Sequence, residues 1–325
     1  MADETIGTYY FQLAPSTEGI GSKINEAMGD AGTSGSKSFG TSFKKGAGIV
    51  GKVVAEAVGA VATGISTITT LAVKNYGEYE QLTGGVDKLF GTGSMGLEEY
   101  AASVGKSVSE AAAEFTTLQE ASASVMANAQ NAFSTAGLSA NEYMETVTGF
   151  SAALISSLEG DTTEAASIAD MAIRDMADNA NVFGTDMESI QNAYQGFAKQ
   201  NYTMLDNLKL GYGGTEKEME RLLADATTLA NLDEPLSIDN YNDVIEAIHI
   251  MQESMSITGT TAKEASGTIE GSLNSLKSAW QNTLTAVAAD DDTFESSLDG
   301  LVSTATSFAE NIAPRIATAV GGIGK

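Results

Sequence analysis

Apolar and polar residues alternate with the period of an α-helix over most of the chain. Apolar side chains between residues 107 and 230 recur every three or four positions, which places them on one face of a helix. One such series is Tyr143, Val147, Phe150, Leu154 and Leu158. The pattern predicts helices at residues 97–105, 108–135, 140–158, 162–180, 186–209, 216–231, 237–256, 261–288 and 290–320, of which 186–209 is either continuous or broken near Gln200.

A Ser or Thr followed three residues later by Glu marks most of the predicted helix starts. In such a capping box the hydroxyl accepts a hydrogen bond from the backbone of the Glu, whose side chain accepts one from the backbone of the cap. The pairs are Ser107–Glu110, Ser139–Glu142, Thr185–Glu188, Thr215–Glu218 and Thr261–Glu264. We expect Asp161 and Ser237 to cap helices as well. The caps predict an array of short helices with short breaks.

The N-terminal part of the chain has a different pattern. Residues 5–13 alternate between apolar and polar, which predicts a single short strand, and a short helix is expected after it. Residues 29–48 are rich in Gly, Ser and Lys and are expected to form a hinge. A heptad seam follows, which is typical of helices that associate. Its members are Val54, Val58, Val61, Ile65, Ile68 and Ala72.

The same Gly- and Ala-rich helix contains an uncharged run, residues 57–73. This run is slightly shorter than the roughly 20 residues that span a bilayer, and it is only weakly hydrophobic. Three interpretations remain open. The helix packs in the core of its own chain or of a sister chain, which the seam favours; or the segment enters a membrane; or it is a flexible helix.

Composition limits the classes of function. The chain has 325 residues, and its hydrophobic fraction of 42% is enough for one or two cores. Its net charge of −26 repels phosphate, so we expect no direct nucleic-acid binding. There is no cysteine, which excludes disulfides, thiolate zinc sites and cysteine nucleophiles. The first residues have no basic region and no apolar run, so we expect no signal peptide.

The sequence predicts no catalytic residue, no cofactor and no metal site, and therefore no enzyme. His249 is the only histidine and lies in an apolar helical pattern, so we expect a packed or half-exposed side chain. Residues 211–215 are glycine-rich but lack the Lys of a phosphate loop and indicate a left-handed turn between helices. The candidate carboxylates are not in a recognisable catalytic pattern. They are Glu98, Glu99, Glu188 and Asp290 to Asp292.

Two phrases in the helical array resemble the core of bacteriophage tail tape-measure proteins. They are AFSTAGLSANEYM at residues 132–144 and GFAKQNYTMLDNL at residues 196–208, and the resemblance extends from about residue 78 to about residue 290. The resemblance implies a structural role. Copies of such a protein occupy the tail tube during assembly, their helical length sets the length of the tube, and they leave ahead of the DNA.

The resemblance also implies partners and a location. The partners would be other copies of the chain and the proteins of the tail tube and of tail assembly, with the host membrane as a further partner during genome ejection. The location would be the virion tail, after synthesis in the cytoplasm of the bacterial host. Members of the family are usually longer, so we expect this chain to be the N-terminal part of a longer member, a prophage remnant or a short ruler.

Together these features predict an all-α protein of short antiparallel helices, with one long N-terminal helix and a single strand. We expect a strand and short helix at 1–35, the Gly/Ala-rich helix at 36–76, the tape-measure core at 77–290 and a C-terminal helix at 291–325. The expected function is tail assembly and tail-length determination. The alternative is a secreted or membrane-active helical protein that inserts residues 49–73 into bilayers.

Overall fold

The computed structural model describes residues 65–289 and 293–323. No strand occurs in these two ranges, and most of their residues are helical, which confirms the all-α class for this part of the chain. The predicted strand, the hinge and Asp290 to Asp292 lie outside the described residues. The chain divides into two compact units, residues 1–71 and 72–325, and the second contains nearly all of the described residues.

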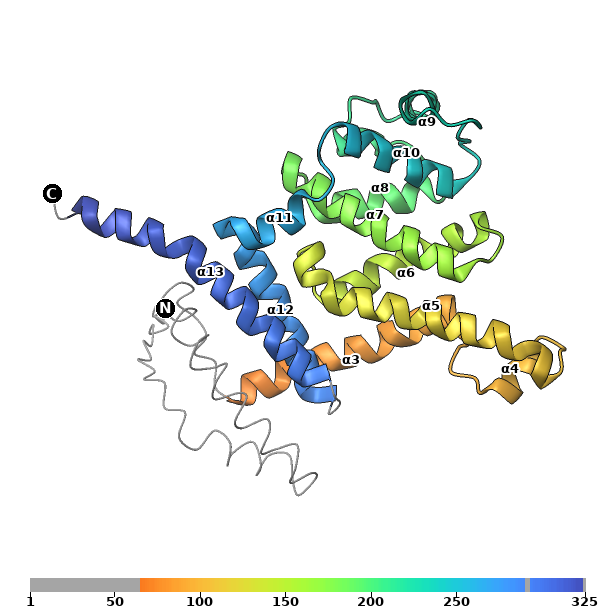
Figure 1. The fold of residues 1–325 in the computed structure, drawn as a ribbon, viewed down its shortest axis with the longest axis horizontal. Helices are drawn as coiled ribbons and strands as arrows, with labels where there is room; N and C mark the ends of the chain where they lie inside the picture. The colour runs from red at the N-terminus through yellow and green to blue at the C-terminus, as the bar shows by residue number, and fades with distance from the viewer. Residues whose placement is uncertain (1–64, 290–292, 324–325) are drawn as a thin grey trace, which may run out of the picture. The chain divides into compact units, whose positions relative to one another are not determined.

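The elements follow one another with short connections (Figure 1). They are α3 (Ile65–Phe90), α4 (Leu97–Ser103), α5 (Val108–Thr135), α6 (Ala140–Ser157), α7 (Thr162–Phe183), α8 (Met187–Phe197), the 3₁₀ helix η1 (Leu205–Leu208), α9 (Glu216–Ala230), α10 (Tyr241–Ser254), α11 (Thr260–Gly267), α12 (Ile269–Ala289) and α13 (Thr293–Ile323). The alternative with a break near Gln200 is correct, because α8 ends at Phe197 and Gln200 has a φ of 57°.

Two of the predicted capping boxes are complete. Ser107 caps α5 and Ser139 caps α6. In both boxes the carboxylate of the Glu three residues later accepts a hydrogen bond from the backbone N–H of the cap. Thr215 caps α9 as predicted, but the carboxylate of Glu218 accepts from Gly213 rather than from the cap. Asp161 accepts two backbone N–H groups at the start of α7, as expected.

Three predicted caps are wrong. Helix α8 is capped by Asp186, because the hydroxyl of Thr185 donates to the carbonyl of Asn207 instead. Helix α10 begins only at Tyr241, with Asn240 as its cap rather than Ser237. Thr261 lies inside the first turn of α11.

The predicted helix at residues 261–288 is also wrong as a single element. Thr268 is extended, with φ −122° and ψ 160°, and it separates α11 from α12. The amide of Asn311, on α13, donates to the carbonyls of Ser266 and Thr268 and so connects both sides of the break to α13. The break is therefore supported by a residue more than forty positions away.

The main core lies where α5, α6, α7, α8 and α10 meet. Figure 1 shows α5, α7 and α10 as successive layers, and α7 packs against both of the others. Alanines at the helix contacts let the helices approach closely, among them Ala165, Ala169 and Ala172 of α7. Larger side chains fill the remaining space, including the aromatic group of Phe150, Tyr194, Phe197, Tyr202 and Tyr241.

A second, smaller core lies between α4 and the N-terminal half of α5. Tyr100, Ala101 and Ala111 are buried there, and Phe115 contacts Tyr100 with a ring-centroid distance of 5.7 Å. Helix α4 packs mainly on α5. This cluster is distinct from the main core, so the two can lose their packing separately.

Candidate functional site

The predicted association seam lies mostly outside the described residues. Its first three members, Val54, Val58 and Val61, precede α3. Ile65 and Ile68 are in the first turns of α3, and only their backbone is described. Ala72 is buried, and near it the carbonyl of Asn75 accepts a hydrogen bond from the amide of α6 residue Asn141. The seam as a surface for association stays a prediction.

The first of the two resembling phrases, residues 132–144, forms the corner between α5 and α6. The carbonyl of Ala132 accepts hydrogen bonds from the backbone of Ala136 at 2.9 Å and of Leu138 at 3.2 Å. Gly137 between them has a φ of +67°, a conformation that glycine adopts at little cost. The residues of this phrase thus end one helix and start the next.

Side chains of α12 bind the backbone of this corner. The hydroxyl of Ser278 donates to the carbonyl of Gly137 at 2.8 Å. The Asn282 side-chain oxygen accepts the N–H of Ala140 at 2.7 Å, and Ser275 donates to the carbonyl of Phe133. The corner is therefore fixed by residues about 140 positions later in the chain.

The second phrase, residues 196–208, forms the turn from α8 into η1. The carbonyl of Gly196 accepts the N–H groups of Lys199 and Asn201, both at 2.9 Å. Beyond the turn, the carbonyl of Leu208 accepts the side-chain amide of Asn179. Tyr202, Leu205 and Leu208 are all buried. Like the first phrase, the second one joins two elements and attaches the junction to the core.

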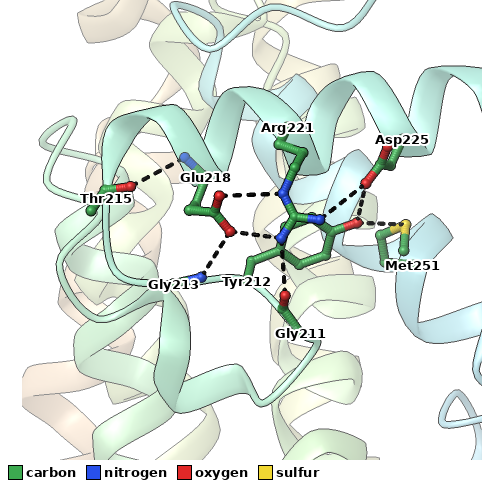
Figure 2. Close-up of polar contacts among 8 residues, drawn as sticks. All are labelled: Gly211, Tyr212, Gly213, Thr215, Glu218, Arg221, Asp225 and Met251. Atoms are coloured by element: carbon green, nitrogen blue, oxygen red, sulfur yellow. Dashed lines mark hydrogen bonds and ion pairs between the residues drawn. The ribbon is translucent and has the colours of Figure 1, made fainter.

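The glycine-rich loop at residues 211–215 is filled by the protein's own side chains (Figure 2). The Arg221 guanidinium lies over the ring of Tyr212, 4.2 Å from its centroid, and donates to the carbonyl of Gly211 at 3.0 Å. It also pairs with Glu218 at 2.6 Å, and this hydrogen bond lowers the pKa of Glu218. Gly211 has a φ of +90°, in keeping with the predicted left-handed turn.

The hydroxyl of Tyr212 closes the other side of the loop. It donates to the carboxylate of Asp225 at 2.8 Å, as Figure 2 shows. Burial, followed by this hydrogen bond, raises the pKa of Tyr212 to about 12. These contacts attach the loop to α9. The carbonyl of Gly211 and the N–H of Gly213 are both hydrogen-bonded to side chains of α9, so neither is directed at a ligand.

His249 is half-buried on α10, within the predicted range of exposure, but it has a partner that the sequence did not indicate. Its Nδ1 lies 2.8 Å from a carboxylate oxygen of Asp175, a buried residue of α7. Burial raises the pKa of Asp175, and the hydrogen bond with Asp175 raises the pKa of His249. Sequence reasoning missed this pair, in which two titratable side chains are in direct contact and both have a raised pKa.

Asp178, also on α7 and also buried, serves a different purpose. Its carboxylate accepts the backbone N–H groups of Gly259 at 2.5 Å and Thr261 at 2.7 Å, at the start of α11. This carboxylate takes the place of the cap that Thr261 was expected to supply. The signal in the sequence was that Asp175 and Asp178 follow Ala172 at steps of three, which places both acids on a buried face of α7.

Of the carboxylates singled out from the sequence, Glu98 and Glu99 lie on a different helix from Glu188, and Asp290 to Asp292 lie outside the described residues. Glu98 and Glu99 lie in the first turn of α4, and Glu188 lies in the first turn of α8. The described residues contain no group of three or more His, Asp or Glu side chains that could hold a metal ion. Glu98, Glu99 and Glu188 therefore belong to no such group within the described ranges.

One groove of about 560 Å³ lies beside the α5–α6 corner. Its walls come from this corner, from the C-terminal end of α7 and from α11 and α12. Both signs of charge occur there, in Glu264, Glu270 and Lys277. Glu142 also lines the groove, whereas His249, Glu98, Glu99 and Glu188 do not.

Within the described ranges, no helix is long and apolar enough to cross a membrane. Of the segment at residues 49–73, only residues 65–73 belong to the described part of α3. Comparisons of the chain with protein-family models, with curated proteins and with solved structures found no match.

Proposed function

We propose that the chain is a structural protein of a bacteriophage tail, a tape-measure protein or its N-terminal part, that acts in tail assembly and in setting tail length. The observation that carries this proposal is the position of the two resembling phrases. Residues 132–144 and 196–208 are junctions between helices, and their backbone groups are bound by distant parts of the chain. The resemblance thus concerns residues that determine how the helical array folds.

We further propose that two kinds of helix have different roles in this function. A helix rises about 1.5 Å per residue, so an extended helix can convert chain length into distance. The helices from α4 to α12 do not extend in this way, because each ends at a junction and packs against another. We therefore assign length determination to helical sequence outside this packed array. The packed array itself would serve as a folded body for assembly.

The partners that we propose are other copies of the chain and proteins of the tail tube and of tail assembly. The acidic character of the chain is consistent with a role beside DNA without binding to it, because like charges repel. The seam at Val54, Val58, Val61, Ile65, Ile68 and Ala72 is the proposed surface for self-association.

Deletion of the coding sequence from the phage or inducible prophage that carries it tests the proposal. Deletion should remove tails of regular length from the lysate, as seen by electron microscopy, and expression of the chain from a plasmid should restore them. The chain should also be found by mass spectrometry in purified tails or tail-assembly intermediates. Normal tails in the deletion strain would refute the proposal.

A further inference from the structure

The chain has one histidine, and the structure places it against a buried acid on another helix. The side chain of Asp175 is 1% exposed and that of His249 is 26% exposed, so water reaches the pair from the histidine side. The second carboxylate oxygen of Asp175 is buried and has no hydrogen-bond partner among the described residues. Compensation of the buried charge on Asp175 therefore depends mainly on His249.

The other charged or titratable groups near the pair come from three helices. They are Arg174 and Asp178 of α7, Glu253 of α10 and Tyr194 of α8. Arg174 is already paired with Asp170 at 2.8 Å, and Asp178 accepts N–H groups of α11. Glu253 is exposed and Tyr194 is fully buried. His249 is thus the cation in direct contact with Asp175.

We propose that the His249–Asp175 contact makes the packing of α10 on α7 depend on pH, with protonated His249 holding α10 in place and its deprotonation loosening α10 together with α9. Helix α10 joins these two neighbours, because it packs on α7 through one face and contacts α9 as well (Figure 1). When His249 is neutral, the buried carboxylate keeps a hydrogen bond but loses its ion pair. The device does not depend on the tail function proposed above.

The direction of the pH effect follows from the geometry. An unfolded histidine titrates near pH 6.5, and the contact with Asp175 raises the pKa of His249 in the folded chain. The stabilisation is therefore complete below about pH 6.5 and is lost as the pH rises through the folded pKa. Burial raises the pKa of Asp175 as well, so the folded chain also holds that proton more firmly and the two effects have the same sign.

Urea denaturation of the full chain between pH 5.5 and 8.5 tests the proposal. The unfolding equilibrium constant should rise with pH, by about tenfold for each unit by which the folded pKa of His249 exceeds 6.5. His249→Gln cannot titrate at this position, so it should lose the part of the rise that the imidazole contributes and keep only the part that comes from the raised pKa of Asp175. Glu253→Gln is the matched control, because it removes a nearby exposed acid that does not contact the ring, and it should keep most of the rise.

Two further measurements locate the effect and do not require a variant. Because His249 is the sole histidine, its imidazole NMR signals report its pKa without assignment ambiguity. That pKa should lie above 6.5 in the folded chain and near 6.5 in urea. Amide exchange of α10 and α9, corrected for intrinsic rates, should accelerate relative to α5 between pH 6 and pH 8. A folded pKa at or below 6.5, or an equal pH dependence in His249→Gln, would overturn the proposal.

Discussion

Gly214 lies where the loop before α9 passes the backbone of Thr203. A β-carbon at this position would overlap the Thr203 carbonyl, whereas one at Gly213 would be 3.6 Å from the flexible side chain of Glu218. We expect Gly214→Ala to destabilise the chain by about 2 kcal/mol, because backbone must move to make room. Gly213→Ala should cost less than about 0.5 kcal/mol. Equal urea midpoints for the two variants would contradict this close approach.

Thr185 and Asp186 provide a second matched pair. Asp186 accepts the backbone N–H of Ser189 at the start of α8, and Thr185 does not cap the helix. Asp186→Ala should lower the free energy of unfolding by about 1 kcal/mol, and Thr185→Ala by less than about 0.5 kcal/mol. If chemical denaturation shows a larger loss for Thr185→Ala than for Asp186→Ala, Thr185 is the cap of α8, as the sequence predicted.

Caps were predictable from the sequence where the cap and its partner are close in the chain. The Ser-x-x-Glu spacing predicts Ser107 and Ser139 correctly because both halves of the box lie within one turn. The same spacing fails at Thr261, because Asp178, from another helix, already binds the N–H groups of that turn. A carboxylate eighty positions away leaves no local signal at the helix that it caps.

At the scale of the element, helix α4 should be the first to open. It packs mainly on α5, through the small core around Tyr100 and Phe115. Phe115→Ala should bring amide exchange in α4 close to its intrinsic rate while changing the global thermal midpoint little, because this cluster is distinct from the main core. Phe150→Ala, in the main core, should instead destabilise the whole array by about 3–5 kcal/mol.

Hydrogen-exchange mass spectrometry on the two variants separates local from global opening. If Phe115→Ala lowers the protection of α7 and α10 as much as that of α4, the small core is part of the main cooperative unit. If exchange in α4 does not change, the contact between Tyr100 and Phe115 does not hold this helix in place.

The helices were predictable because most of them bury one continuous apolar face. The ranges for α5, α6 and α9 agree with the structure to within one residue. The break at Thr268 was not predictable, since the local pattern is helical and Asn311 of α13 supports the extended residue. The His249–Asp175 contact was missed for a similar reason, because its two members are 74 positions apart and each lies in an ordinary helical pattern.

At the scale of the whole molecule, the all-α class followed from the sequence, whereas the arrangement of the helices did not. The placement of α12, for example, depends on the contacts of Ser278 and Asn282 with the α5–α6 corner, which no periodicity indicates. For the function, the sequence offers only a hypothesis, which rests on the resemblance of residues 132–144 and 196–208. The packing of these phrases is consistent with a structural role, and their action in a tail remains the central proposal.

The most direct measurement is the length of tails made with a longer chain. We would insert four heptads, 28 residues copied from the pattern of residues 54–72, after Thr63. The same 28 residues inserted between Asp233 and Glu234, in the exposed loop before α10, serve as the control, because the ends of that loop are fixed by the packed array. Electron microscopy of purified particles then gives both tail lengths.

We expect tails longer by about 42 Å for the insertion after Thr63, at about 1.5 Å per residue, and tails of unchanged length for the loop insertion. Tails of unchanged length after the first insertion, in particles that still contain the protein, would contradict the proposal that the helix predicted at residues 36–76 determines tail length.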